Sequence, residues 1–147
     1  MNVFILDVNP RKAAQMQCDR HVVKMVLESA QILSTIAGGP YKPTHQNHPC
    51  VVWARACRTN YNWLRRHAHA LCEEYTHRYG RVHKCEGVIN SLEAPELPVG
   101  ITPFVQCMPD EFKDPDPVQA YRKYYRGTKP HIAKWTNREV PFWWEAE

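Results

Sequence analysis

Apolar side chains recur every three or four positions in two long stretches of the chain, and the first lies between residues 11 and 37. The apolar and small residues that recur in this first stretch are Val22, Met25, Val26, Ser29, Ala30, Leu33 and Ile36. This period places them in a stripe on one face of an α-helix. Asn9-Pro10 favours a helix start, since proline suits the first turn, and Gly38-Gly39-Pro40 favours a stop. We therefore expect one helix over about residues 11–37.

The second stretch begins at Pro49 or Val51 and ends at Tyr79, directly before Gly80. Its apolar positions again fit the helical period, and they are Val52, Ala56, Tyr61, Leu64, Ala68, Leu71 and Tyr75. Asn60 is a candidate position for a break. The pattern thus predicts a second long helix, with or without an interruption at that residue.

The other segments are shorter. Residues 2–7 fit a short strand or an extended lead-in, residues 81–94 allow one short helix, and residues 118–126 are helical in pattern. Residues 95–118 carry six of the twelve prolines and predict an ordered, irregular connector on the surface, because proline breaks helices and central strands. The expected fold is mainly α: a single-domain helical bundle over residues 1–147, with two long helices and a proline-rich connector.

Composition narrows the cellular setting. The chain has 147 residues and a formal net charge of +4, which is compatible with a polyanionic partner without proving one. It shows no signal peptide and no apolar run of membrane length. We therefore expect a protein of the cytoplasm with no membrane partner, and we expect it to be a monomer. The cysteines are expected to be free thiols; they are Cys18, Cys50, Cys57, Cys72, Cys85 and Cys107.

Close pairs of histidine and cysteine raise the question of a metal. The pairs are Cys18 and His21, His45 and His48, His67 and His69, and His83 and Cys85. None has a CxxC, HExxH or zinc-finger spacing, and nothing in the sequence makes four ligands converge. We expect no metal and no cofactor, and a metal-dependent hydrolase remains an alternative.

Charged residues on the first predicted helix form a second candidate group. His21, Lys24 and Glu28 lie at positions i, i+3 and i+7, so they share a helix face. A carboxylate beside cations suits acid–base chemistry near a phosphate, and it equally fits an ordinary salt-bridged surface. The spacing leaves both interpretations open.

The stretch "YKPTHQNHP" leads into the second predicted helix. Pro49 suits the first helical position, so Asn47 or His48 becomes the N-cap. Backbone amides at a helix start can bind an anion, which would make His45 and His48 phosphate contacts. Helix capping alone explains the same residues.

Cations and aromatic residues alternate between Tyr121 and Trp135. The cations are Arg122, Lys123, Arg126, Lys129 and Lys134, and the aromatic residues between the two ends are Tyr124 and Tyr125. Cations neutralise phosphates and aromatic faces stack on exposed bases. The alternative is a helix whose tyrosines pack in the core and whose charges are solvated.

The order of these features resembles the pyrimidine-dimer DNA glycosylases, small all-α base-excision enzymes of phages and bacteria. The resemblance rests on "VFILDVNP", "CDRHVVKMVLESAQIL", "YKPTHQNHPCVVW", "EEYTHRYGRVHK" and "YRKYYRGTK". Asn47-His48-Pro49 is the most specific of these patterns. The similarity covers about residues 3–84 and the region of Tyr121, and it leaves out the connector and the C-terminal tryptophans.

The resemblance implies a DNA glycosylase, with or without AP-lyase activity, that excises a damaged or modified base from duplex DNA. If a phage encodes the protein, the expected cytoplasm is that of the host. In that family the N-terminal α-amine attacks the sugar C1′ and forms a Schiff base, a glutamate of the first helix assists, and arginines hold phosphates. Carried over, the catalytic candidates are Met1, His21, Glu28 and His48. The DNA-binding candidates are Arg20, Lys24, Lys42, His45, Asn47, Lys84, Arg122, Lys123, Tyr124, Tyr125 and Arg126.

The start of the chain departs from the family pattern. Met1 is usually removed only when the second residue is small, and Asn2 is larger than that. No basic residue stands among positions 2–8. The amine therefore belongs to Met1, a lysine replaces it, or the lyase chemistry is absent. Two further alternatives use the same scaffold: a phage-type DNA base-modifying enzyme and a non-catalytic nucleic-acid-binding protein.

Overall fold

The computed structural model describes residues 1–145, and every regular element in that range is helical. In chain order these are α1 (Pro10–Met16), α2 (Asp19–Ala37), α3 (Pro49–Ala56), α4 (Arg58–Tyr79), α5 (Glu86–Ser91), the short 3₁₀ turn η1 (Asp110–Phe112), α6 (Pro117–Thr128) and the 3₁₀ turn η2 (Pro130–Ile132). The mainly α fold class is thereby confirmed. Within residues 1–145, no helix is both long and apolar enough to cross a lipid bilayer.

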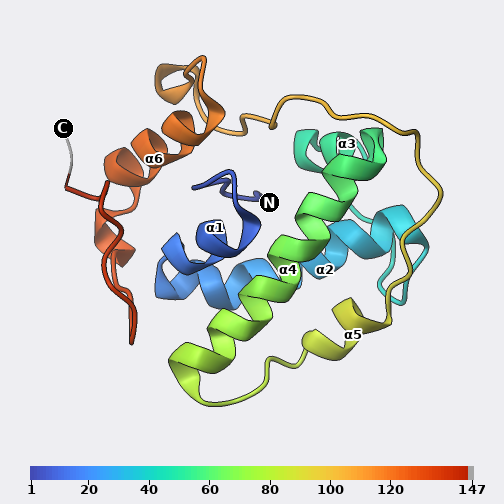
Figure 1. The fold of residues 1–147 in the computed structure, drawn as a ribbon, viewed down its shortest axis with the longest axis horizontal. Helices are drawn as coiled ribbons and strands as arrows, with labels where there is room; N and C mark the ends of the chain where they lie inside the picture. The colour runs from blue at the N-terminus through green and yellow to red at the C-terminus, as the bar shows by residue number, and fades with distance from the viewer. Residues whose placement is uncertain (146–147) are drawn as a thin grey trace.

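The long helix α4 organises the core. It contacts α1, α2, α3 and α5, and it crosses the middle of the molecule in Figure 1. Tyr61, Leu64 and Leu71 on its inner face are fully buried. Gly38 and Gly80 end α2 and α4 in the left-handed conformation, with φ of 72° and 69°, which glycine adopts without steric cost.

The expected helix over residues 11–37 is instead two helices, with a break at Gln17 and Cys18. The C-terminal segment supplies partners for backbone groups at this break. The Trp135 indole donates to the Met16 carbonyl at 2.9 Å, and the Asp19 amide donates to the Lys134 carbonyl at 2.8 Å. Tertiary hydrogen bonds thus compensate for those that a continuous helix would have made.

The second long helix is also broken, at Cys57, three residues before the candidate break at Asn60. The Asn60 side-chain amide donates to the Trp53 carbonyl at 2.9 Å, and the Arg58 amide donates to the Pro98 carbonyl. The break changes the phase of the helix, so Val52, expected in the apolar stripe, is 46% exposed.

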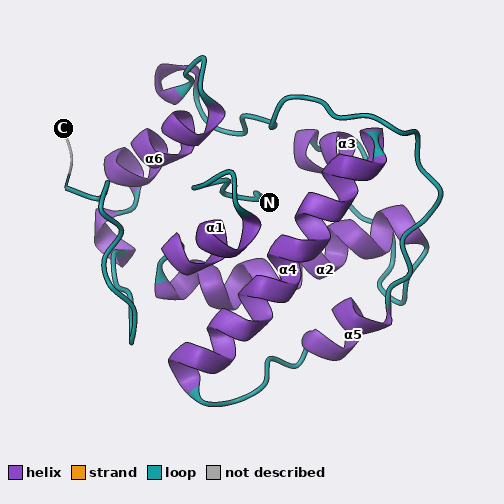
Figure 2. Cartoon of the chain, in the orientation of Figure 1, coloured by secondary structure: helices purple, strands orange, loops and turns teal. Residues whose placement is uncertain are grey.

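Two irregular segments complete the fold, and both are loops in Figure 2. Residues 2–7 form no strand and no helix, and the N-terminus lies near the centre of the view, between α6 and α4 (Figure 1). The proline-rich connector has only η1 as regular structure. It passes from α5 around the outside of α3 to α6 (Figure 1).

Candidate active site

The first residues of the chain turn sharply inward. Phe4 has a φ of 52°, a left-handed conformation that bulky residues rarely adopt. Its ring stacks on His21, with centroids 4.2 Å apart and planes 15° apart. The Asn2 side chain accepts hydrogen bonds from the Val3 and Phe4 amides and donates to the Cys107 carbonyl at 2.8 Å. These contacts hold a strained turn that positions the α-amine of Met1.

That α-amine faces the carboxylate of Glu28 on α2, which the sequence analysis gave as a catalytic candidate. The Met1 nitrogen lies 3.3 Å from Oε1 of Glu28. Glu28 was expected on the polar side of its helix, but it is only 8% exposed, because the N-terminal segment covers it. Its Oε2 has no hydrogen-bond partner in residues 1–145, and the Lys24 ammonium lies 4.0 Å away from it. Glu28 thus keeps a free acceptor in a buried position.

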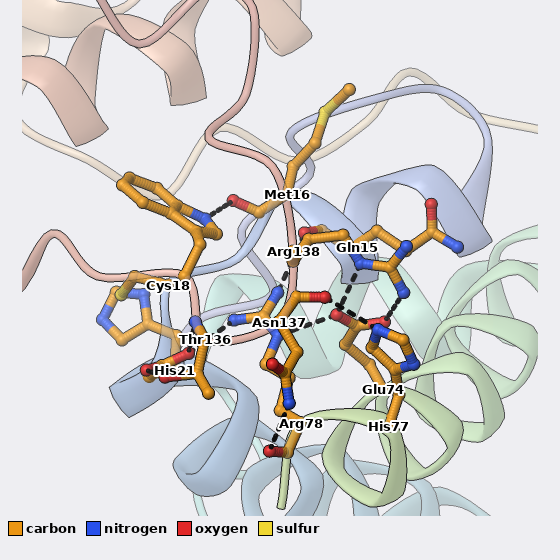
Figure 3. Close-up of polar contacts among 12 residues, drawn as sticks. Gln15, Met16, Cys18, His21, Glu74, His77, Arg78, Thr136, Asn137 and Arg138 are labelled. Carbon is orange, nitrogen blue, oxygen red and sulfur yellow. Dashed lines mark hydrogen bonds and ion pairs between the residues drawn. The ribbon is translucent and has the colours of Figure 1, made fainter.

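A second group of buried charges gives a useful contrast (Figure 3). Both oxygens of Glu74 are taken, by the Arg78 guanidinium at 2.7 Å and the Arg138 guanidinium at 2.6 Å. Although burial acts in the opposite direction, these hydrogen bonds hold the pKa of Glu74 below its ordinary value. Arg78 also pairs with Asp19 at 3.0 Å, so the network joins α2, α4 and the C-terminal segment. With every oxygen of Glu74 satisfied, we assign this group to stability.

His21 lies beside the site but is poorly suited to proton transfer. Burial, followed by the charges of Lys129, Lys24 and His131, lowers the pKa of His21 to about 3. Its Nδ1 lies 2.5 Å from the Tyr125 hydroxyl. The imidazole is therefore neutral near pH 7, and its contact with Phe4 gives it a structural role in positioning the N-terminus. A catalytic role for His21 stays a prediction.

His48 caps α3, which settles the choice between Asn47 and His48. Its Nδ1 accepts a hydrogen bond from the Cys50 amide at 3.1 Å. Its Nε2 lies 3.9 Å from Sγ of Cys107 on the connector. Burial and then the positive charge of the Met1 amine lower the pKa of His48. His48 thus caps α3 and also lies at the N-terminal site.

The other close pairs of histidine and cysteine have structural partners. His67 is fully buried between the Gln17 side chain and the Pro10 carbonyl, and burial lowers its pKa to about 4. His83 lies between the Val23 carbonyl and the Cys85 amide. All six cysteines are unpaired, as expected. One group of three possible metal ligands occurs in residues 1–145; it comprises His48, Cys50 and Cys107, with ligand atoms within 4.8 Å of one another.

A basic cleft adjoins the N-terminal site. Arg20 and Lys24 of α2 line it together with His131 and Lys134 of the C-terminal segment, around a volume of about 560 Å³. Lys24 belongs both to this cleft and to the ion pair with Glu28. Two of the predicted DNA contacts, Arg20 and Lys24, are therefore brought to one surface beside the amine, where cations can bind phosphates.

In the basic and aromatic segment, Tyr121 to Trp135, more side chains point into the core than the sequence led us to expect. Tyr125 is fully buried, and Arg122 is 8% exposed and donates to the Leu6 carbonyl. Both side chains are buried in the core, so a contact of either residue with DNA stays a prediction that this packing does not support. The others remain at least partly accessible: Lys123 pairs with Asp114, Tyr124 carries Lys129 over its ring at 4.9 Å, and Arg126 donates to the Trp143 carbonyl.

The remaining predicted DNA contacts lie on exposed turns. Lys42, His45, Asn47 and Lys84 are all exposed, and no hydrogen bond or ion pair within residues 1–145 joins their side chains to the Met1 amine or Glu28. Sequence reasoning missed four residues of the site: Phe4, Cys50, Cys107 and His131. The only signal in the sequence was the high cysteine count, which could have drawn attention to Cys50 and Cys107.

Comparison with known proteins gives one match. The sequence model of the pyrimidine dimer DNA glycosylase family matches residues 1–86, more than half of the chain. No curated protein and no solved structure matches the chain significantly. The matched segment includes Met1, α2 with Glu28, the turn at His48 and the whole of α4.

Proposed function

Because the chain belongs to the pyrimidine dimer DNA glycosylase family, we propose that it excises a damaged pyrimidine base from duplex DNA with the α-amine of Met1 as nucleophile. One observation carries the proposal: the Met1 nitrogen lies 3.3 Å from a buried carboxylate that has a free oxygen. An amine beside a carboxylate is a nucleophile with its base. The exposed flank of the site is basic, which suits a polyanionic substrate.

In the proposed reaction, Glu28 accepts a proton from the Met1 ammonium through Oε1. The neutral amine then attacks C1′ of the nucleotide, the C1′–N bond breaks, and the base leaves with that bond's electrons and takes up a proton. Loss of a further proton and opening of the sugar give a Schiff base between the Met1 nitrogen and C1′. Oε2 of Glu28 remains available to hydrogen-bond the sugar.

Neighbouring groups would bind and orient the DNA in this scheme. Arg20, Lys24 and Lys134 bind phosphates along the cleft, and His131 lines the same surface. His48 contributes a neutral imidazole near the amine, and Phe4 with His21 keeps the N-terminal turn in place. AP-lyase activity follows if the Schiff base persists long enough for elimination of the 3′ phosphate.

The test is an assay that separates base release from strand cleavage. An end-labelled duplex with one cyclobutane pyrimidine dimer is incubated with the protein, and half of each sample is treated with hot alkali. Cleavage only after alkali indicates a glycosylase, and cleavage without alkali indicates an added lyase. Binding without release from dimer, oxidised or alkylated duplexes would contradict the proposal and favour a non-catalytic binding protein. A mass increase of an intact base would favour a base-modifying enzyme.

A further inference from the structure

Three side chains beside the N-terminus are not used by the proposed reaction as nucleophile or base. His48 and Cys50 lie at the start of α3, and Cys107 comes from the proline-rich connector. Their ligand atoms lie within 4.8 Å of one another. Two thiols and an imidazole at this distance suit either a metal site or a reactive thiol, and the hydrogen bonds decide between them.

The helix cap fixes the position of the proton on His48. Nδ1 accepts from the Cys50 amide, so the proton of the neutral ring is on Nε2. Nε2 faces Sγ of Cys107 at 3.9 Å and donates toward it. A metal bound to Nε2 would require the proton on Nδ1, where the backbone amide already donates. The arrangement therefore favours a thiol that accepts hydrogen bonds over a metal ligand.

The buried Cys50 thiol is the second neighbour of the Cys107 sulfur, within 4.8 Å of it. A hydrogen bond from Cys50 lowers the pKa of Cys107 to about 7, and the charges of the Met1 amine and Lys113 act in the same direction against burial. The pKa of Cys50 is raised, first by the same hydrogen bond and then by burial. The two thiols thus differ in chemical character: Cys107 approaches a thiolate, and Cys50 stays protonated.

Accessibility also separates Cys107 from the other cysteines. Cys107 is partly exposed, whereas the remaining five are buried. Asn2 donates to its carbonyl, and its amide donates to the Tyr121 hydroxyl at 3.2 Å, so the thiol is held in place on the wall of the N-terminal site. A partly exposed thiol that faces an imidazole donor and lies beside a second thiol is the arrangement expected of a reactive cysteine.

We propose that Cys107 is a site of oxidative modification, with Cys50 as its resolving thiol. The Cys107 thiolate attacks one oxygen of a hydroperoxide, the O–O bond breaks, and water or an alcohol leaves after taking up a proton. Cys107 is then a sulfenic acid. The Cys50 sulfur attacks the oxidised sulfur, the S–OH bond breaks, and water leaves, which gives a Cys50–Cys107 disulfide. This site does not depend on the proposed glycosylase reaction.

The experiment uses the full chain and hydrogen peroxide. The protein is treated with substoichiometric iodoacetamide at pH 7, or with peroxide followed by alkylation, and its cysteine peptides are quantified by mass spectrometry. We expect Cys107 to be alkylated roughly tenfold faster than any other cysteine, in line with its thiolate fraction. Peroxide should give a Cys50–Cys107 peptide pair, two hydrogens lighter than the reduced peptides.

Two variants complete the test. In Cys50→Ser, peroxide should leave Cys107 as a sulfenic acid that dimedone captures, with no disulfide. Cys72→Ser is the matched control and should behave as the parent, since burial raises the pKa of the Cys72 thiol to about 12. Equal alkylation of all six cysteines, or a disulfide that does not involve Cys107, would overturn the proposal. Zinc bound at one equivalent and lost in Cys107→Ser would overturn it in favour of a metal site.

Discussion

The α-amino nitrogen of Met1 lies 3.3 Å from Oε1 of Glu28, across 27 positions of sequence. The turn at Phe4 makes this approach possible, and the stacking of Phe4 on His21 stabilises the turn. A buried carboxylate next to a chain terminus is unusual, because burial of charge costs free energy unless the partner is close. This pair links the fold of the chain to the chemistry proposed for it.

Replacing Glu28 with glutamine keeps the shape of the side chain and removes its base. We expect base release to fall by about 10² to 10⁴ in rate, the range typical of a lost general base, while DNA affinity stays within a few-fold. Single-turnover assays and fluorescence anisotropy measure the two quantities. Glu73→Gln, on the exposed surface of α4, is the control and should retain the parent rate. An unchanged rate in Glu28→Gln would remove this carboxylate from the mechanism.

Removing cations from the basic cleft should weaken binding in proportion to the phosphates lost. We expect Arg20→Ala and Lys134→Ala each to reduce the slope of log affinity against log salt concentration by about one. Arg66→Ala, on the exposed part of α4 and outside this cleft, serves as the control. Salt titrations of duplex binding provide the measurement. Equal slopes for the parent and for both cleft variants would show that DNA binds elsewhere.

The charge network around Glu74 should contribute to stability and not to catalysis. Glu74→Ala removes one of the two carboxylates that pair with the buried Arg78 and the carboxylate that pairs with Arg138, so we expect the free energy of unfolding to fall by about 3 kcal/mol. Glu73→Ala, whose exposed pair with Arg11 is a weak one, should cost less than about 1 kcal/mol. Urea denaturation followed by circular dichroism compares them. Similar losses for both variants would contradict the assignment.

Two buried histidines make stability depend on pH. Burial lowers the pKa of His21 to about 3 and that of His67 to about 4, from an unfolded value near 6.5. The unfolded chain therefore binds protons first as pH falls. The stabilisation is fully present above pH 6.5 and is lost progressively down to the folded pKa values. Between pH 7 and pH 5 we expect a loss of roughly 2 kcal/mol per histidine in the free energy of unfolding.

Urea unfolding at several pH values checks this expectation, with His67→Asn as the comparison. The variant should be less stable than the parent at pH 7. Between pH 7 and pH 5, however, its free energy of unfolding should fall by roughly 2 kcal/mol less than that of the parent, because one of the two histidines is gone. A flat pH profile in the parent chain would mean that the pKa values of these imidazoles in the folded protein stay near the unfolded value despite their burial.

Much of the helical architecture could be predicted from the sequence, because apolar period and glycine stops act locally. The breaks at Cys18 and Cys57 could not, since the Lys134 and Pro98 carbonyls that bind backbone amides next to them come from distant segments. The same limit applies to burial: the sequence left open whether Tyr125 faces DNA or the core, and the burial of Arg122 depends on the packing of α6 against the N-terminal segment.

The residues of the candidate site likewise fall into those that the sequence could predict and those that it could not. Met1, Glu28 and His48 could be nominated from the sequence, because the family pattern marks their neighbourhoods. Cys107 could not, because an irregular connector of many prolines gives no indication of where its residues lie. The hydrogen bond from Asn2 to the Cys107 carbonyl joins that segment directly to the N-terminus.

The nucleophile is the central claim, and borohydride trapping tests it most directly. The protein is incubated with pyrimidine-dimer duplex and sodium borohydride, which reduces a Schiff base to a stable amine, and the adduct is digested and mapped by mass spectrometry. We predict one adduct, on the α-nitrogen of the Met1 peptide, which disappears when two residues are added before Met1. An adduct on a lysine such as Lys24, or base release without any adduct, would contradict the claim.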